Sequence, residues 1–248
     1  MLRLILTLLF LLIFFIISIP LFLIEWIISK INKKAADTSS LKIVQAAFKG
    51  VAFFSGIKLT VKGEENIPTD ESVLYVGNHR SFFDIVVTYP ICKNLTGYIA
   101  KEGIFKVPIL GTWMKRLYCL ALNRENTREA LKTILKAIEY IKSGISVCIF
   151  PEGTRSHDPE NLLPFKEGSL KIAEKTGCAI VPFAICGSDD VFENHFPWIY
   201  STNVIVEYGK PIYPKELDAE AKKNLGAYTQ DIIQRMYTAN RNAYLLNK

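Results

Sequence analysis

A histidine and an aspartate five positions apart, His79 and Asp84, are the residues in this sequence best suited to acid–base chemistry. On one continuous helix they would lie roughly 140° apart and would not meet. If Ser81 instead begins a new helix, Asp84 is the acid of a capping box, and its carboxylate turns back toward the loop that holds His79. The carboxylate would then orient the imidazole, whose other nitrogen would accept a proton from a substrate hydroxyl. On composition alone, an equally good interpretation is that Asp84 only caps the helix and that His79 is an ordinary loop residue.

A second polar cluster, residues 151–156, follows an apolar stretch that ends at Phe150. Gly153 permits close backbone approach, Thr154 offers a hydroxyl, and Arg155 has the planar guanidinium that suits a phosphate. Glu152 has three open roles, since it could position the arginine, hold a substrate hydroxyl or support the loop. The alternative is a plain turn with a solvated arginine. Because sites in α/β sheets lie beyond the carboxyl ends of strands, both clusters stand where a site is expected.

The rest of the body alternates between short apolar segments and segments with helical periodicity, which predicts an α/β fold with a mixed sheet flanked by helices. The expected strands are residues 58–62, 73–76, 98–100, 118–122, 145–150, 179–185 and 203–208. The expected helices are residues 42–54, 81–89, 127–142, 169–175 and 217–244.

The N-terminal segment, residues 1–34, is expected to be a membrane anchor, followed by one domain over residues 35–248. Leu4 to Ile24 runs 21 residues without a charge, and a helix of that length spans about 30 Å of hydrocarbon. Pro20 interrupts the run, so a kinked membrane helix and a re-entrant helical hairpin both fit. A cleaved signal peptide fits less well, because the run has no small-x-small cleavage site.

Charge favours a lipid surface over nucleic acid as a partner. The chain has 30 Lys and Arg against 24 Asp and Glu, a net charge of +6, and residues 1–34 supply +3 of it. Cations beside a membrane segment gain about 1 kcal/mol each at an anionic leaflet. Positive charge after the apolar run predicts that the body faces the cytoplasm, although Arg3 lies on the other side. No nucleic-acid-reading motif is present.

The number and spacing of the cysteines and histidines predict neither disulfide bonds nor a metal site. The five cysteines are odd in number and lack a Cys-x-x-Cys pair, so we expect reduced, poorly nucleophilic core residues. His157 and His195 are too isolated to form a ligand set, and no metal is predicted.

Four sequence blocks together resemble the glycerolipid acyltransferases, most closely the 1-acylglycerol-3-phosphate acyltransferases. The first block is Asn78 to Asp84, and the third is Phe-Pro-Glu-Gly-Thr-Arg-Ser at residues 150–156. The second resembles Lys101 through Gly111 to Arg124, and the fourth resembles Val181-Pro182-Phe183. The match covers about residues 60–210. One departure is Asn123, where the family often has aspartate before the arginine.

This resemblance implies transfer of a fatty acyl chain from a thioester, on acyl-CoA or acyl carrier protein, to the sn-2 hydroxyl of 1-acylglycerol 3-phosphate. The product would be phosphatidate, and no cofactor is implied. His79 would be the general base, Asp84 would orient it, and Glu152 would support the site. The resemblance assigns the acceptor's binding to basic and loop residues: Lys101, Arg124, Gly153, Thr154 and Arg155.

Other functions remain open. An acyltransferase acting on glycerol 3-phosphate or on another lysophospholipid would use the same residues. A non-catalytic membrane phospholipid-binding protein would need the anchor and Arg155 but not His79. A thioester hydrolase would release free fatty acid. A covalent acyl-enzyme on Ser81 is disfavoured, because that serine is needed as a cap and no Gly-x-Ser-x-Gly elbow occurs.

Overall fold

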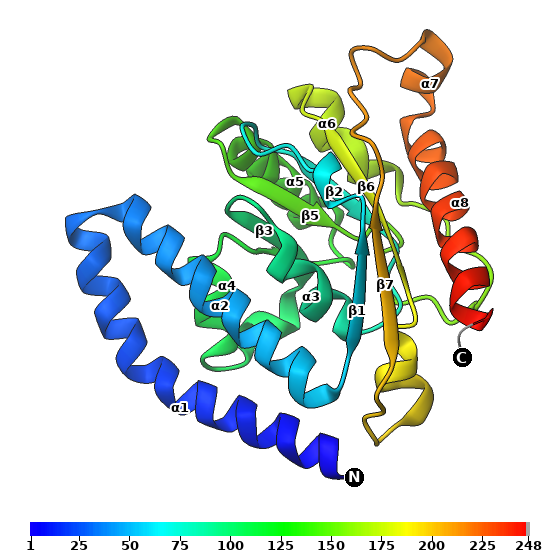
Figure 1. Cartoon of the computed structure of the whole chain (residues 1–248). Coiled ribbons are helices and arrows are strands. Elements are labelled where there is room, and N and C mark those ends of the chain that lie inside the picture. Colours follow the sequence, from blue (N-terminus) through cyan, green and yellow to red (C-terminus); the bar gives the residue numbers. More distant parts are fainter. Residues whose placement is uncertain (247–248) are drawn as a thin grey trace.

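A seven-stranded sheet forms the centre of the molecule (Figure 1). The structure is a computed structural model that describes residues 1–246, except for the side chain of Glu167. The strands pair in the order β1-β7-β6-β2-β5-β3-β4. Their bounds are β1 Lys58–Lys62, β2 Leu74–Gly77, β3 Thr96–Lys101, β4 Leu120–Leu122, β5 Ser146–Ile149, β6 Ile180–Cys186 and β7 Asn203–Tyr208. Among the strand pairs of residues 1–246, β6 with β7 is antiparallel and the others are parallel, so the expected mixed sheet is confirmed.

Helices cover both faces of this sheet. Alternate side chains of a strand point to opposite faces, and β2 shows it: Tyr75 belongs to one core, and Leu74 and Val76 belong to the other. The first core is closed by α2 Lys33–Ser55, α3 Phe83–Thr88 and α4 Leu110–Arg116, with α1 Leu2–Ile31 outside them. The second core is closed by α5 Thr127–Lys142, α6 Lys171–Thr176 and α8 Leu225–Leu246, and α8 follows the short α7 Ala219–Lys223.

Short 3-10 turns complete the connections, and several lie at the carboxyl edge of the parallel strands. They are η1 Glu64–Asn66, η2 Tyr89–Ile91, η3 Glu102–Lys106, η4 Glu167–Leu170, η5 Asp189–Val191 and η6 Glu193–His195.

The expected strands are all present, whereas several helix boundaries differ from those expected. The helix expected from residue 42 begins at Lys33, because Asn32 caps it by accepting a hydrogen bond from the amide of Ala35 (3.0 Å). The helix expected over residues 81–89 begins at Phe83, and the last helix is divided at Asn224. The boundary drawn at residue 34 falls in the first turn of α2, and the division into anchor and domain stays a prediction.

The helix α1 is continuous through Pro20, so the chain does not reverse at the proline. The reversal comes at Asn32, whose backbone is extended (φ −148°). A proline inside a helix costs about 3 kcal/mol through the lost hydrogen bond and a steric clash, and the remaining turns of this helix of 30 residues offset it. A hairpin is formed by α1 and α2 (Figure 1), and whether this N-terminal part spans a membrane or re-enters it stays a prediction.

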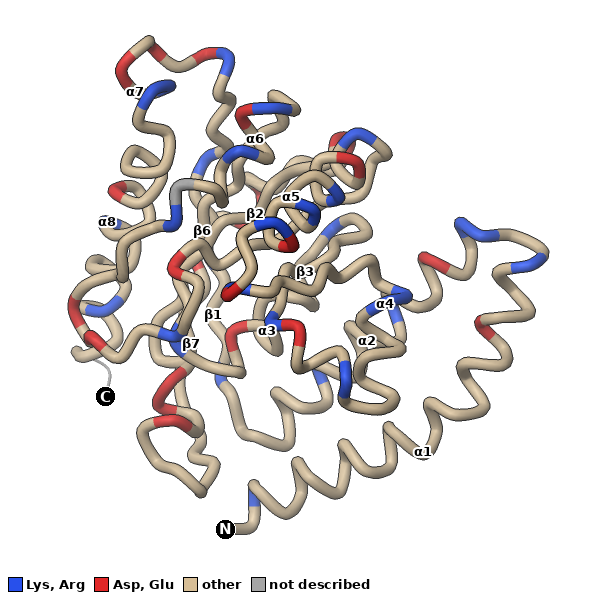
Figure 2. The backbone as a smooth tube through the Cα atoms, turned by 180° about the vertical axis from the view of Figure 1, so that it is seen from behind, with Lys and Arg blue, Asp and Glu red and all other residues tan. Residues whose placement is uncertain are grey.

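One face of α1 is attached to the body through polar contacts. Three polar side chains of this helix are buried and bonded to α2 or α4: Thr7 to Ser55 (3.2 Å), Ser18 to Trp113 (2.8 Å), and Glu25 to Ser40 (2.9 Å) and Arg116 (3.2 Å). Most other side chains of α1 are exposed and apolar, and Figure 2 shows the helix uncharged along most of its length. Such a helix is a candidate membrane span, the only one in residues 1–246.

We expect Arg116→Ala to weaken the attachment of α1 to the body. Glu25 is 1% exposed, and breaking a buried ion pair from one side costs about 3–5 kcal/mol, because a charge is left uncompensated. The melting temperature in detergent should fall, and protease should cut α1 sooner. Lys115→Ala is the control, since Lys115 is an exposed cation on the same helix. The double variant Glu25→Gln with Arg116→Met should recover much of the loss, and an Arg116→Ala protein as stable as wild type would contradict the role of the pair.

Candidate active site

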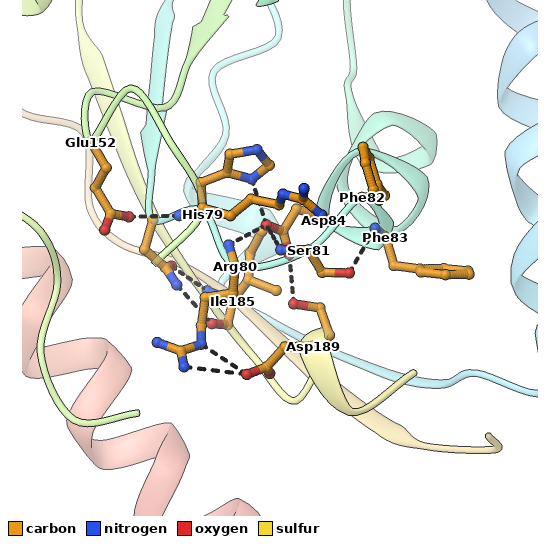
Figure 3. Close-up of polar contacts among 12 residues, drawn as sticks. His79, Arg80, Ser81, Phe82, Phe83, Asp84, Glu152, Ile185 and Asp189 are labelled. Atoms are coloured by element: carbon orange, nitrogen blue, oxygen red, sulfur yellow. Dashed lines mark hydrogen bonds and ion pairs between the residues drawn. The ribbon is translucent and has the colours of Figure 1, made fainter. Parts of the chain in front are cut away.

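His79 and Asp84 lie together at the carboxyl end of β2. The Nδ1 atom of His79 is 2.7 Å from Oδ2 of Asp84 (Figure 3). The chain bends between them as the capping argument requires, because Asp84 Oδ2 accepts the amide of Ser81 (2.9 Å). The hydroxyl of Ser81 accepts the amide of Phe83 (2.9 Å), one residue earlier than in the standard box. The local sequence thus turns the carboxylate back onto the imidazole.

The carboxylate of Asp84 is fully buried and held from several sides. Its Oδ2 also accepts the amide of Arg80 (2.7 Å), and its Oδ1 accepts the hydroxyl of Ser188 (2.6 Å). Buried carboxylates need such donors, since an unpaired buried charge is costly. The contacts leave Asp84 one orientation, and that orientation fixes the ring of His79.

The ring of His79 is held on its face and open at one nitrogen. Phe150 stacks against it, with centroids 4.4 Å apart and planes inclined by 17°. The side chain is 17% exposed, and within residues 1–246 Nε2 has no hydrogen-bond partner in the protein. With Nδ1 donating to Asp84, Nε2 is the neutral ring's acceptor, and it can take a proton from a bound hydroxyl.

Glu152 supports the site through the backbone. Its Oε1 accepts the amide of His79 (2.7 Å), and its Oε2 accepts the amide of Leu163 (2.8 Å). Burial raises the pKa of this carboxyl, and the two amides oppose the shift. Of the three roles left open by the sequence, the geometry matches support of the loop.

Arg155 reaches the same loop from the segment after β5. Its guanidinium lies over the ring of Phe82, 3.9 Å from the centroid, and its Nη1 donates to Glu193 Oε1 (3.0 Å). The two clusters are also joined by the backbone, since the amide of Ser156 donates to the carbonyl of His79 (2.7 Å). The cation is therefore placed beside the His–Asp loop, with a third of its side chain exposed.

The other predicted binding residues lie along the same edge of the sheet without contacting His79. Gly153 has φ +72°, a left-handed conformation that favours glycine, and Thr154 is exposed in the same loop. Lys101 ends β3 and Arg124 follows β4, and both are exposed. In the strand order these ends are two and three positions from β2, about 10 and 14 Å away at the usual strand spacing.

Asn123, the departure from the family pattern, accepts the amides of Glu125 (3.0 Å) and Asn126 (3.2 Å). This side chain thus closes the turn that carries Arg124, and the arginine itself stays exposed.

Several contacts that shape the site were not predicted from the sequence. Asn78 ties β2 to β6, because its side chain exchanges two hydrogen bonds with the backbone of Ile185 (2.9 and 2.7 Å). Ser188 and Glu193 follow β6, more than 100 residues from His79. Since β6 is parallel to β2, its carboxyl end lies at the same edge. No local spacing signals such a contact.

We expect the cysteines to resist alkylation in the folded protein. Burial raises the pKa of Cys92 to about 11 and those of Cys119 and Cys186 to about 12. At pH 8 a thiol of pKa 11 is about one part in 10³ thiolate, and the thiolate is the nucleophile. Iodoacetamide should therefore label the native protein slowly at pH 8, faster at pH 10, and fully in guanidinium. Rapid labelling of one native thiol at pH 8 would contradict this and would make that cysteine a candidate nucleophile.

Comparison with known proteins agrees with this geometry. Residues 58–186 match the acyltransferase family, and the chain belongs to this family. It is 35% identical over 170 residues to a chloroplast 1-acyl-sn-glycerol-3-phosphate acyltransferase of Arabidopsis thaliana, covering 68% of this chain and 47% of the relative. It is 27% identical to the 1-acyl-sn-glycerol-3-phosphate acyltransferase of Escherichia coli, over 76% of each chain.

A solved structure resembles nearly the whole chain. The crystal structure of the 1-acyl-sn-glycerophosphate acyltransferase from Thermotoga maritima superposes with a TM-score of 0.77 at 29% identity, covering 94% of each chain. The chain spans about half the length of the chloroplast relatives. The fold and the family resemblance expected from the four sequence blocks are confirmed.

Proposed function

We propose that this protein transfers a fatty acyl chain from a thioester donor to the sn-2 hydroxyl of 1-acylglycerol 3-phosphate, giving phosphatidate. The observation that carries the proposal is the 2.7 Å contact between His79 Nδ1 and the buried Asp84, which leaves Nε2 open. The names of the relatives support lysophosphatidate as the acceptor.

Transfer is direct in this proposal. Nε2 of His79 takes the proton of the acceptor hydroxyl while the hydroxyl oxygen bonds to the thioester carbonyl carbon. The carbon–sulfur bond then breaks, and the leaving thiolate receives the proton from the imidazolium. Asp84 stabilises the imidazolium between these steps. Positioned proton transfer of this kind contributes about 10²–10⁴ in rate.

The acceptor's phosphate is assigned to Arg155. A guanidinium suits a phosphate because it offers planar, charged donors. Arg155 is held in place by stacking on Phe82, which lies between His79 and Asp84 in the sequence. Lys101 at the end of β3 and Arg124 after β4 add positive charge along the same edge of the sheet. Gly153 and Thr154 shape the loop that carries Arg155.

The test is an acceptor panel with a labelled acyl donor. Detergent-solubilised protein receives acyl-CoA or acyl carrier protein thioester in separate reactions, with 1-acylglycerol 3-phosphate, glycerol 3-phosphate, lysophosphatidylcholine or monoacylglycerol. We expect labelled phosphatidate, and little product from the phosphate-free alcohol. Free fatty acid as the main product would indicate a thioester hydrolase. Acceptor binding without turnover would favour a phospholipid-binding protein.

Attachment to a membrane through α1 is part of this proposal. The exposed apolar side chains of α1 form a surface that water disfavours, whereas its polar side chains are bonded to the body. The body is then held where lipid acceptors enter, and the lysines near Asn32 favour the anionic cytoplasmic leaflet. Vesicle flotation tests this: wild type should float with anionic vesicles, and a protein with Leu8, Leu12 and Ile16 changed to serine should float less.

A further inference from the structure

Glu193 places a carboxylate between the two loops that form the site. Its Oε1 accepts the amide of Phe82 (2.8 Å) and Nη1 of Arg155 (3.0 Å), and its Oε2 accepts the hydroxyl of Ser81 (2.6 Å). The side chain is 11% exposed. This residue lies in the connection between β6 and β7, outside the residues 58–186 that match the family.

The donors around Glu193 are of the kinds that bind a phosphate oxygen. A backbone amide, a hydroxyl and a guanidinium are all common phosphate ligands, and the charged donor gives the strongest bond. A guanidinium carries five N–H donors. In the described part of the chain Arg155 uses Nη1 for Glu193, and its other donors have no protein partner.

The carboxylate of Glu193 gives the donors of the two loops a shared acceptor. Without it, the Phe82 amide and the Arg155 guanidinium would lose their shared acceptor, and a hydrogen bond to a charged group contributes about 1.5–3 kcal/mol. The same anion opposes an incoming phosphate, because like charges a few ångströms apart repel strongly at a protein surface. A neutral headgroup is attracted to Arg155 too weakly to displace the carboxylate of Glu193. A phosphate dianion carries more negative charge than that carboxylate and is attracted more strongly.

We propose that Glu193 is a built-in substitute for the acceptor's phosphate, exchanged for it when the acceptor binds, and that it sets the selectivity for phosphate-bearing acceptors. The proposal rests on the proposed function for the identity of the acceptor. The exchange itself is a property of the anion site, and inorganic phosphate can report on it without turnover.

The test compares inorganic phosphate binding by calorimetry in wild type and Glu193→Gln. Glutamine keeps an oxygen for Phe82 and Arg155, and its amide can donate to Ser81, so mainly the charge is lost. Removing one like charge should tighten phosphate binding about tenfold, and the KM for 1-acylglycerol 3-phosphate should fall in parallel. Adding Arg155→Met to Glu193→Gln should abolish the gain. Glu174→Gln, an exposed acid on α6, is the charge-matched control and should bind like wild type.

The outcomes separate the two proposals. Unchanged or weaker phosphate binding in Glu193→Gln would overturn the exchange and leave Glu193 as a positioning residue, even if transfer to 1-acylglycerol 3-phosphate is intact. Tighter phosphate binding with no transfer by wild type would support the exchange and defeat the proposed function. If the glutamine variant does not fold, Glu193→Ala makes the same test, because it removes the carboxylate and leaves its donors to the phosphate.

Discussion

His79→Ala should reduce acyl transfer by about 10²–10⁴ fold, the usual contribution of positioned proton transfer. The change removes the imidazole that takes the hydroxyl proton in the proposed mechanism, while the backbone contacts of residue 79 with Glu152 and Ser156 remain. The initial rate of phosphatidate formation at saturating donor and acceptor measures the effect. Vesicle flotation and the melting temperature should stay close to those of wild type.

The matched control is His157→Ala, since His157 is exposed and the described residues show no hydrogen bond between it and His79 or Asp84. Added imidazole should restore part of the activity of His79→Ala, because a free base can enter the space left by the ring. Equal rates for His79→Ala and wild type would rule out the general-base role and favour a binding protein or a different base.

Asp84→Asn should also lower the rate by about 10²–10⁴ fold, with little change in fold. An asparagine oxygen in place of Oδ2 can still accept from His79 and from the amides of Arg80 and Ser81. Its amide can donate to Ser188, because a hydroxyl is both donor and acceptor. The substitution therefore removes the negative charge that stabilises the imidazolium and keeps the hydrogen bonds.

Ser188→Ala provides the contrast for Asp84→Asn. It removes the donor to Oδ1 but keeps the carboxylate charge, so the rate should fall only about tenfold, the worth of one hydrogen bond to a charged group. Circular dichroism and melting temperature check both proteins. An Asp84→Asn enzyme with full activity would mean that Asp84 only caps the helix.

The His–Asp contact could be predicted because the turn that brings the two residues together is local, although Ser188 and Phe150, which hold their side chains, lie far along the chain. Ser81 lies between the two residues and turns the chain, and the spacing of five positions then places the carboxylate beside the imidazole. The seven strands were equally accessible, since most are short apolar runs bounded by turn residues and β1 alternates polar and apolar residues. The start of α2 was missed because residues 33–41 are mostly polar, and their helix depends on the cap at Asn32 and on packing against α1.

The sequence by itself determined the chemistry of the site: which imidazole meets which carboxylate, which loop carries the arginine, and which segment is apolar enough to meet lipid. Only the tertiary structure decided the order of the strands, and that order brings Ser188 and Glu193 to the His–Asp loop. It also decided that α1 packs against α2 and α4 through Ser18 and Glu25. The reason is physical, because a turn is set by neighbours along the chain, whereas strand order depends on which buried faces and polar partners fit together across the whole fold.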